Sequence, residues 1–249
     1  MTPGPRLWRC FPWDPAAHPG DAFSPSYVPP GQGAGRFDLQ DQPSVLYLAE
    51  SPVHAVGEAL QEFRGGVFKA GYLRRVGRGL ALVGVTLDAG LAEMVPDLTE
   101  PAVLVRLETR PDALAHHDRR VTQAIARSLH LKGYAGFRWW SAITGGWHAT
   151  TLFRDRLPPE QLAFETPSLL RPDSEPVREA LVLLGIRPVC PPLRLGFRSL
   201  RLGRESVRMG LRARVARRHR AAPVRGHRRL HAGAYRNQRR TPGSAGSVR

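Results

Sequence analysis

Cysteine is scarce in this sequence, and its placement excludes several kinds of site. The 249-residue chain has two cysteines, Cys10 and Cys190, which lie far apart and form no CxxC pair. A disulfide framework or a thiolate zinc site needs more cysteines at closer spacings. The chain therefore fits a reducing compartment, where a domain of this size needs no cross-links.

Long apolar runs are also missing. The longest, at about residues 80–87, is far shorter than the roughly 20 residues that span a bilayer. The N-terminal segment MTPGPRLWRCFPWDP lacks the apolar stretch of a signal peptide. We therefore expect a soluble, cytoplasmic protein with no membrane partner.

Several common catalytic motifs do not occur. The sequence contains no GxGxxG after a strand pattern, no GxxxxGK[ST], no HExxH and no GxSxG. The usual signatures of nucleotide-binding loops, zinc proteases and serine hydrolases are thus absent. His116, His117 and His148 have no carboxylate or cysteine at ligand spacing, so we expect no metal site.

Acidic residues are almost absent from the C-terminal segment. Residues 191–249 carry 17 Arg and a single acid, Glu205, whereas residues 1–190 carry 20 basic and 20 acidic side chains. The whole formal net charge of +16 therefore belongs to that segment. We predict one domain over residues 1–190 and an Arg-rich, disordered tail over residues 191–249.

Three interpretations of the tail stay open. It could be a charged arm that binds nucleic acid or an acidic partner through counterion release, a neutral appendage, or the out-of-frame translation of GC-rich DNA. The appendage and the out-of-frame translation are favoured over the arm. The pattern of the domain ends near Pro188, and the tail has no lysine and only one acidic residue. Lysine occurs only at Lys69 and Lys132 in the whole chain, which indicates GC-rich coding.

Hydrophobic patterning predicts an α+β domain. Residues 1–43 are rich in proline and glycine and read as loop, apart from a strand at 6–11. The pattern further predicts strands at 44–49, 79–87, 102–107, 135–140 and 148–153, and helices at 51–63, 118–130 and 175–184. Regular strand-helix repeats are missing, so we expect a compact mixed sheet with flanking helices. The strands at 135–140 and 148–153 should form a hairpin that turns at Gly145 and Gly146.

The helix at 51–63 carries a candidate site residue. Ser51 is a good N-cap, and a proline follows it at the first helical position. Apolar residues at spacings of three and four form its buried stripe: Val53, Val56, Leu60 and Phe63. Glu58 lies beside this stripe and can point towards a neighbouring element.

Three segments in this order resemble the RES domain, a family named for its Arg, Glu and Ser. In GRFDLQDQPSVLYLAESPVHAVGE, residues 35–58, Arg36 follows a glycine-rich loop, Tyr47 ends a strand eleven residues later, and Glu58 follows after eleven more. Ser141 comes late, after GYAGFRWW at residues 133–140. The resemblance covers about residues 5–187, with Phe37 and Asp38 where the family commonly has Trp and Asn.

This resemblance implies a fold related to the ADP-ribosyltransferases and an enzyme that degrades NAD⁺. Such a toxin cleaves the nicotinamide–ribose bond by glycohydrolysis or phosphorolysis, so NAD⁺ is the substrate, inorganic phosphate is a potential co-substrate and no cofactor is needed. The resemblance also implies an antitoxin partner with a helix-turn-helix domain. Whether the protein forms a homodimer stays open.

The resemblance and the residue types together suggest roles. Glu58 can stabilise the positive charge that develops on the ribose. Arg36 can bind the pyrophosphate through a two-pronged contact, with Arg9 as a weaker second contact. Tyr47 can stack on the nicotinamide. Ser141 can hydrogen-bond Glu58 or the ribose.

Each role has an ordinary structural alternative. Arg36 could be a solvated loop residue paired with Asp38, and Tyr47 could belong to the core. Glu58 could be a surface residue or form an ion pair with Arg64 or another nearby base, and Ser141 could only shape a turn. Asp38 would also place a negative charge near bound phosphates.

Further alternatives concern the pocket and the function. Trp140 is a candidate pocket wall. The chain could also be a nucleic-acid-binding protein that acts through its tail, or an ADP-ribosyltransferase that modifies a macromolecule.

Overall fold

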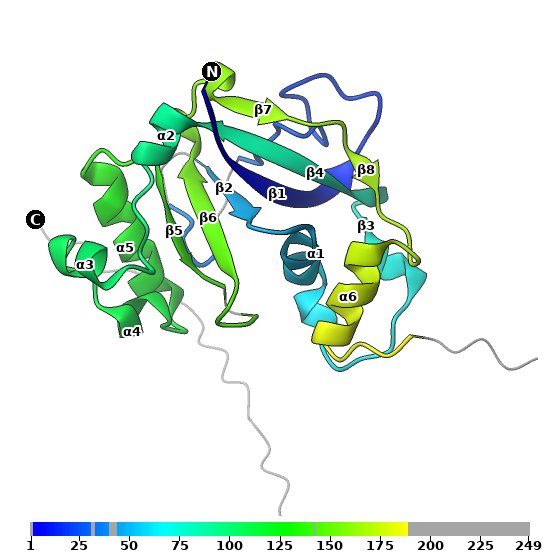
Figure 1. Cartoon of the computed structure of the whole chain (residues 1–249). Helices are drawn as coiled ribbons and strands as arrows, with labels where there is room; N and C mark the ends of the chain where they lie inside the picture. The colour runs from blue at the N-terminus through cyan, green and yellow to red at the C-terminus, as the bar shows by residue number, and fades with distance from the viewer. Residues whose placement is uncertain (1, 31–32, 40–43, 142, 189–249) are drawn as a thin grey trace, which may run out of the picture. The chain divides into compact units, whose positions relative to one another are not determined.

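The computed structural model describes residues 2–30, 33–39, 44–141 and 143–188 (Figure 1). Its centre is one antiparallel sheet in the order β3-β4-β1-β2-β6-β5. β7 and β8 also pair with β4, on the same side as β3 and opposite β1. The strands are β1 (Pro3–Trp13), β2 (Val45–Ala49), β3 (Arg74–Arg75), β4 (Arg78–Asp88), β5 (Gly136–Trp140), β6 (His148–Phe153), β7 (Leu162–Phe164) and β8 (Ser168–Leu169).

Helices flank this sheet in two groups. α1 packs against α6, whereas α3, α4 and α5 gather beside β5 and β6 (Figure 1). The α-helices are α1 (Pro52–Leu60), α2 (Ala89–Glu93), α3 (Pro101–Arg106), α4 (Pro111–Leu114), α5 (Arg119–Leu131) and α6 (Glu175–Leu183). Short 3₁₀ turns are η1 (Gln61–Phe63), η2 (Ala70–Leu73), η3 (Arg154–Arg156) and η4 (Pro159–Gln161). The predicted α+β class, with a mixed arrangement of sheet and flanking helices, is confirmed.

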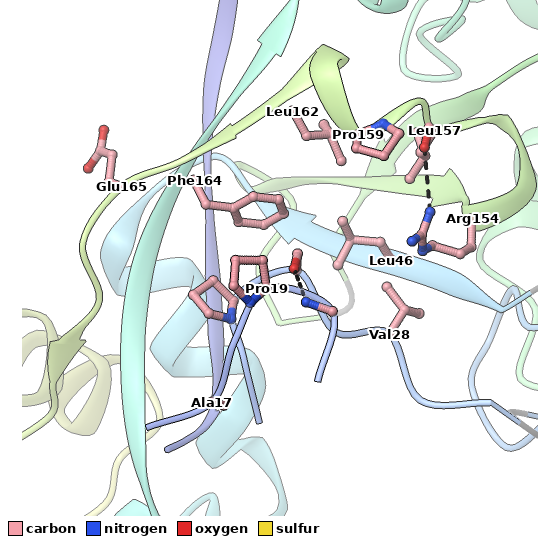
Figure 2. A pocket seen from close by; sticks show the side chains of 13 residues that line it. Ala17, Pro19, Val28, Leu46, Arg154, Leu157, Pro159, Leu162, Phe164 and Glu165 are labelled. Carbon is pink, nitrogen blue, oxygen red and sulfur yellow. Dashed lines mark hydrogen bonds between the residues drawn. The ribbon is translucent and has the colours of Figure 1, made fainter. Parts of the chain in front are cut away.

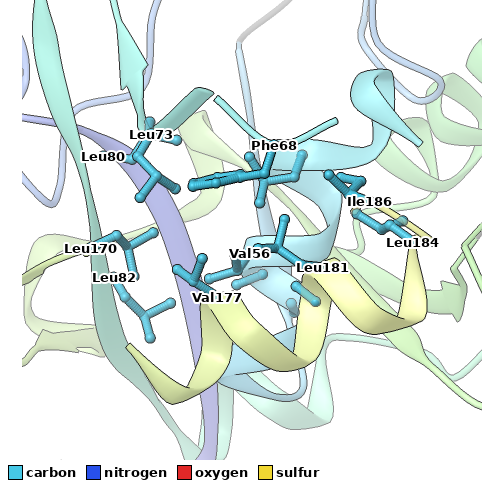
Figure 3. Close-up of a cluster of buried hydrophobic side chains, with 14 residues drawn as sticks. Val56, Phe68, Leu73, Leu80, Leu82, Leu170, Val177, Leu181, Leu184 and Ile186 are labelled. Carbon is cyan, nitrogen blue, oxygen red and sulfur yellow. The ribbon is translucent and has the colours of Figure 1, made fainter. Parts of the chain in front are cut away.

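One hydrophobic cluster joins α1 to α6 and to the β1–β4 part of the sheet (Figure 3). Val56 and Leu60 of α1 are completely buried in it, and Val53 and Phe63 pack against its edge. Each fully buried side chain of this size contributes about 1.5–3 kcal/mol relative to exposure. The predicted stripe on this helix is therefore confirmed, and it holds α1 in place along the sheet.

A second cluster packs α5 against β5 and the loop before β2. Phe37 is completely buried there, with its ring centroid 5.0 Å from that of Phe137 and 4.6 Å from that of Trp139. Edge-on contacts of this kind add to the free energy gained from burial. Phe37 thus anchors the loop that contains Arg36.

The sheet opens between β1 and β2. These two strands share one paired position, Trp8 with Ala49, in the described part of the chain, whereas β1 pairs with β4 along most of its length. β2 pairs fully with β6 on its other side. The two halves of the sheet therefore diverge beside β1 and β2, which leaves a gap in the pairing.

Most predicted elements are present, but the strand predicted at 102–107 is wrong. That segment is α3, in which Pro101 occupies the first turn. Leu104 and Leu107 are buried three residues apart, while Val105 between them is 79% exposed. This spacing follows the period of a helix, and the short apolar run could not distinguish it from a strand.

The predicted N-cap at Ser51 is confirmed. Ser51 caps α1 by accepting a hydrogen bond from the His54 amide, and Asp118 caps α5 in the same way through the Arg120 amide. Gly133, with φ of 92°, follows the end of α5, where a glycine adopts the left-handed conformation readily. In the described residues, no helix has the length and apolar character to span a membrane. The predicted boundary at residue 190 and the predicted tail lie outside the described residues.

Candidate active site

Glu58 and Ser141 lie side by side at the open part of the sheet. The hydroxyl of Ser141 donates to Oε1 of Glu58 at 2.8 Å, and Nε2 of Gln61 donates to Oε2 at 3.1 Å. The Glu58 side chain is 33% exposed, so its carboxylate is accessible while it is held in place. These contacts, and not the suggested ion pair with Arg64, orient Glu58 in the described residues.

The turn between β5 and β6 brings Ser141 to α1. The amide of Ser141 donates to the carbonyl of Trp147 at 2.7 Å, and its hydroxyl accepts from the amide of Ile143 at 3.1 Å. The indole of Trp147 packs against Gly57, where an added Cβ would lie 3.1 Å from that ring. A glycine just before Glu58 therefore lets the turn approach the helix closely.

His54 is a third partner of Glu58, and it was not among the candidates from the sequence. Its Nε2 lies 3.2 Å from Oε1 of Glu58, and its ring centroid lies 4.9 Å from that of Trp147. The spacing of four residues on one helix was the available signal, because it places two side chains on the same face.

Arg36 reaches the same region from the loop before β2. Its guanidinium donates to the carbonyl of Leu114 and lies 5.3 Å from the ring centroid of Trp139. Burial lowers the pKa of Arg36, and the nearby negative charge of Glu58 offsets part of this effect. The guanidinium stays charged at neutral pH, so the site contains a cation and a carboxylate that influence each other.

Asp38 and Tyr47 organise the glycine-rich loop. The Tyr47 hydroxyl donates to Oδ1 of Asp38 at 2.7 Å, and Oδ2 of Asp38 accepts from the amides of Gly33 and Gly35 at 2.9 and 2.6 Å. A Cβ at Gly35 would lie 2.8 Å from the Tyr47 hydroxyl, so this close approach requires glycine. Burial and the hydrogen bond to Asp38 raise the pKa of Tyr47.

The charge of Asp38 is thus buried within the loop. From the sequence, this charge could also have lain beside Arg36 or beside bound phosphates. In the structure the carboxylate of Asp38 accepts hydrogen bonds from two backbone amides and from Tyr47, and Asp38 is almost completely buried.

A cavity of about 350 Å³ lies at the gap between β1 and β2. Its walls include four predicted site residues: Arg9, Arg36, Tyr47 and Glu58. The fifth, Ser141, is hydrogen-bonded to Glu58 of this wall. Trp139 lines this cavity, whereas Trp140, the suggested pocket wall, lines a separate groove beside α3.

Arg9 contributes charge to the cavity while its guanidinium is largely engaged elsewhere. Its Nη1 and Nη2 donate to the carbonyls of Pro25 and Tyr27 at 2.5 and 2.6 Å. Burial lowers the pKa of Arg9 to about 10, which still leaves it charged at neutral pH. Arg9 therefore ties the loop over residues 25–27 to the strand that forms one wall of the cavity.

Cys10 also lines the cavity, but it is a poor nucleophile there. Burial raises the pKa of its thiol to about 12, although Arg75 and Arg9 act in the opposite direction. Since the thiolate is the reactive form, Cys10 is unreactive at neutral pH.

A second cavity, of about 490 Å³, is mainly apolar and has no comparable set of groups (Figure 2). Its walls include Val28, Leu46 and Phe164. The Arg154 side chain at its edge donates to the carbonyl of Leu157, and Glu165 is paired with Arg6 at 2.7 Å. The cavity beside Glu58 is therefore the better candidate for chemistry.

Two of the histidines considered as metal ligands, His116 and His148, have local partners. Nδ1 of His116 accepts from the amide of Asp118 at 3.0 Å, and Nδ1 of His148 lies 3.0 Å from Oε2 of Glu50. Within the part of the chain that the structure describes, no three His, Cys, Asp or Glu side chains are grouped to hold a metal ion.

More than half of the chain matches one known family. The profile of the RES domain matches residues 6–173, which include Arg36, Glu58 and Ser141. The chain belongs to the RES domain family. One solved structure similar to this RES domain is the M. tuberculosis MbcT–MbcA toxin-antitoxin complex. The match has 21% identity and a TM-score of 0.46, and covers 68% of this chain and 85% of that one. No curated protein matches.

Proposed function

We propose that this RES domain is a cytoplasmic toxin that degrades NAD⁺ by cleaving its nicotinamide–ribose bond. The observation that carries the proposal is the carboxylate of Glu58, held by Ser141 at 2.8 Å in the wall of a cavity that Arg36 and Tyr47 also line. The cavity, at about 350 Å³, lies within the usual range for small-molecule sites.

Glu58 would act on the ribose. Cleavage of the bond to nicotinamide passes through a state with positive charge on the sugar ring, and a fixed carboxylate stabilises that charge. Because Ser141 holds Oε1 of the carboxylate, little rearrangement is needed when the charge develops.

Arg36 would bind the phosphates. In the described residues its Nε is buried without a hydrogen-bond partner, and a phosphate oxygen would satisfy it. A guanidinium can also donate from two nitrogens to one phosphate. Arg9, whose terminal nitrogens hold the neighbouring loop, would add long-range attraction rather than a direct contact.

Tyr47 and Trp139 would hold the nicotinamide ring. Their side chains line the cavity, and each is locked by its own hydrogen bond: Tyr47 to Asp38 at 2.7 Å, and Trp139 Nε1 to Thr151 Oγ1 at 3.0 Å. Fixed aromatic rings can stack on a planar ligand without losing conformational entropy.

Membership of the RES family supports the remaining part of the proposal, an antitoxin partner with a helix-turn-helix domain. Such a partner would neutralise the enzyme when both are produced together. Expression of the chain alone should slow growth and deplete NAD⁺, and co-expression of the partner should restore both.

Product analysis tests the reaction. The full-length protein is incubated with NAD⁺, with and without inorganic phosphate, and the products are separated by chromatography. We expect free nicotinamide together with ADP-ribose or its 1″-phosphate. Absence of nicotinamide would overturn the proposal, and nicotinamide release with a mass gain on an added macromolecule would identify an ADP-ribosyltransferase instead.

A further inference from the structure

His54 is a buried histidine whose position the proposed chemistry does not yet explain. It is 0% exposed and lies outside the walls of the cavity beside Glu58, so a ligand there would not touch it. Its Nδ1 is buried and has no hydrogen-bond partner among the described residues. A buried polar atom without a partner costs free energy, and such atoms are rare in folded proteins.

The contact with Glu58 determines which ring nitrogen carries the proton. An ionised carboxylate can only accept hydrogen bonds, so Nε2 of His54 must be the donor over the 3.2 Å to Oε1. In the neutral ring this leaves Nδ1 as a bare lone pair, which is the atom without a partner. The packing of the ring against Trp147 keeps it in this orientation.

We propose that His54 is a positioning residue that directs one oxygen of Glu58 towards the ligand. Two donors, Nε2 of His54 and the hydroxyl of Ser141, converge on Oε1. Oε2 has only the side chain of Gln61 as a partner among the described residues, and Gln61 lines the cavity. The oxygen that acts on the ligand is therefore Oε2, with Gln61 as the contact that the ligand displaces.

This role accounts for a polar side chain at a site that an apolar one would fill. An apolar residue of similar volume would pack beneath Trp147 without leaving an unpaired nitrogen. The unpaired Nδ1 of His54 thus lowers the stability of the fold, whereas its Nε2 orients Glu58. The inference rests on the proposed cleavage of NAD⁺, because the oriented carboxylate matters only if Glu58 acts on a ligand.

A pair of variants with nearly equal shape tests the inference. His54→Gln can place an amide nitrogen near the position of Nε2, whereas His54→Met has similar length and volume but no donor. Both residues have good helix propensity, so α1 is retained in both. For each full-length variant, kcat and KM for NAD⁺ and the melting temperature are measured.

We expect His54→Met to lower kcat about tenfold or more, as expected for loss of a hydrogen bond to a charged group, with KM changed less than about twofold. His54→Gln should recover most of kcat, and the melting temperature of His54→Met should equal or exceed that of His54→Gln.

His130 provides a matched control. It is also a buried histidine bonded to a carboxylate, Asp155 at 2.9 Å, but it packs against Phe153 and does not line the cavity beside Glu58. His130→Met should lower the melting temperature and leave kcat of the folded protein unchanged.

The outcomes separate this inference from the proposed function. Equal kcat for His54→Met and the unchanged protein, or equal loss in the Met and Gln variants, would overturn the role of His54 alone. A failure of the unchanged protein to release nicotinamide would overturn the proposed function, and the inference with it.

Discussion

The hydroxyl of Ser141 donates to Oε1 of Glu58 at 2.8 Å, although the two residues are 83 positions apart. One belongs to the turn after β5 and the other to α1, and Gly57 permits the close packing between them. The contact gives the carboxylate a fixed direction at the gap in the sheet. It also explains why two distant sequence segments belong to one site.

Replacement of Ser141 by alanine should mainly affect turnover. Loss of a hydrogen bond to a charged group corresponds to about a tenfold or greater fall in kcat, with a smaller effect on KM. Steady-state kinetics of nicotinamide release measure both. Ser174→Ala is the control, because that hydroxyl accepts from the amide of Arg171 beside α6, and its kcat should be unchanged. Equal activity of Ser141→Ala and the wild type would contradict this role.

Replacement of Arg36 by alanine should mainly affect NAD⁺ binding. We expect KM to rise about tenfold or more, since a charge-assisted contact to phosphate is lost. Arg36→Lys keeps the charge without the two-pronged geometry, so its KM should lie between those of the wild type and Arg36→Ala. Arg110→Ala removes an exposed arginine that pairs with Asp112 and should leave KM unchanged. An unchanged KM in Arg36→Ala would exclude this residue as the phosphate contact.

Asp38→Asn should loosen the loop that contains Arg36. The amide group cannot accept from Gly33, Gly35 and Tyr47 together, and leaving buried donors unpaired costs about 1–3 kcal/mol of unfolding free energy. Denaturant unfolding measures this loss. Asp112→Asn, at an exposed carboxylate, should change stability by less than about 0.5 kcal/mol. Equal stabilities of these two variants would show that Asp38 does not organise the loop.

Asp97 should make stability depend on acid pH. Burial opposes its ionisation, but hydrogen bonds from Thr99 and Arg138 outweigh burial and lower the pKa of Asp97. Because the folded pKa is below the unfolded value of about 3.9, the ionised group stabilises the fold above that value, and this contribution is lost as the pH falls through the folded pKa. Melting temperatures measured from about pH 6 to pH 2 should fall more steeply for the wild type than for Asp97→Asn. Parallel curves would contradict the assignment.

Local signals in the sequence predicted the elements that surround the site. The N-cap at Ser51 and the stripe that includes Val56 and Leu60 depend on neighbouring residues, so they could be recognised without tertiary information. The strand predicted at 102–107 was wrong because the local pattern of this segment is ambiguous. It is short and apolar, and only its packing through Leu104 and Leu107 shows that it is helical.

Sequence motifs also brought Arg36, Tyr47, Glu58 and Ser141 forward as candidates, and the structure places them around one gap in the sheet. Their roles in catalysis stay predictions. The partners of these side chains could not be predicted, because they are set by long-range packing. The burial of the Asp38 charge against backbone amides is one example.

The most direct test compares nicotinamide release from NAD⁺ by the full-length wild type, Glu58→Gln and Glu62→Gln. Glu58→Gln keeps the shape of the side chain but removes the charge, and Glu62 is an exposed carboxylate one turn further on, paired with Arg75. We expect Glu58→Gln to lose about a hundredfold or more in kcat with an unchanged melting temperature, and Glu62→Gln to match the wild type. Wild-type turnover by Glu58→Gln would contradict the assignment of this cavity as the active site.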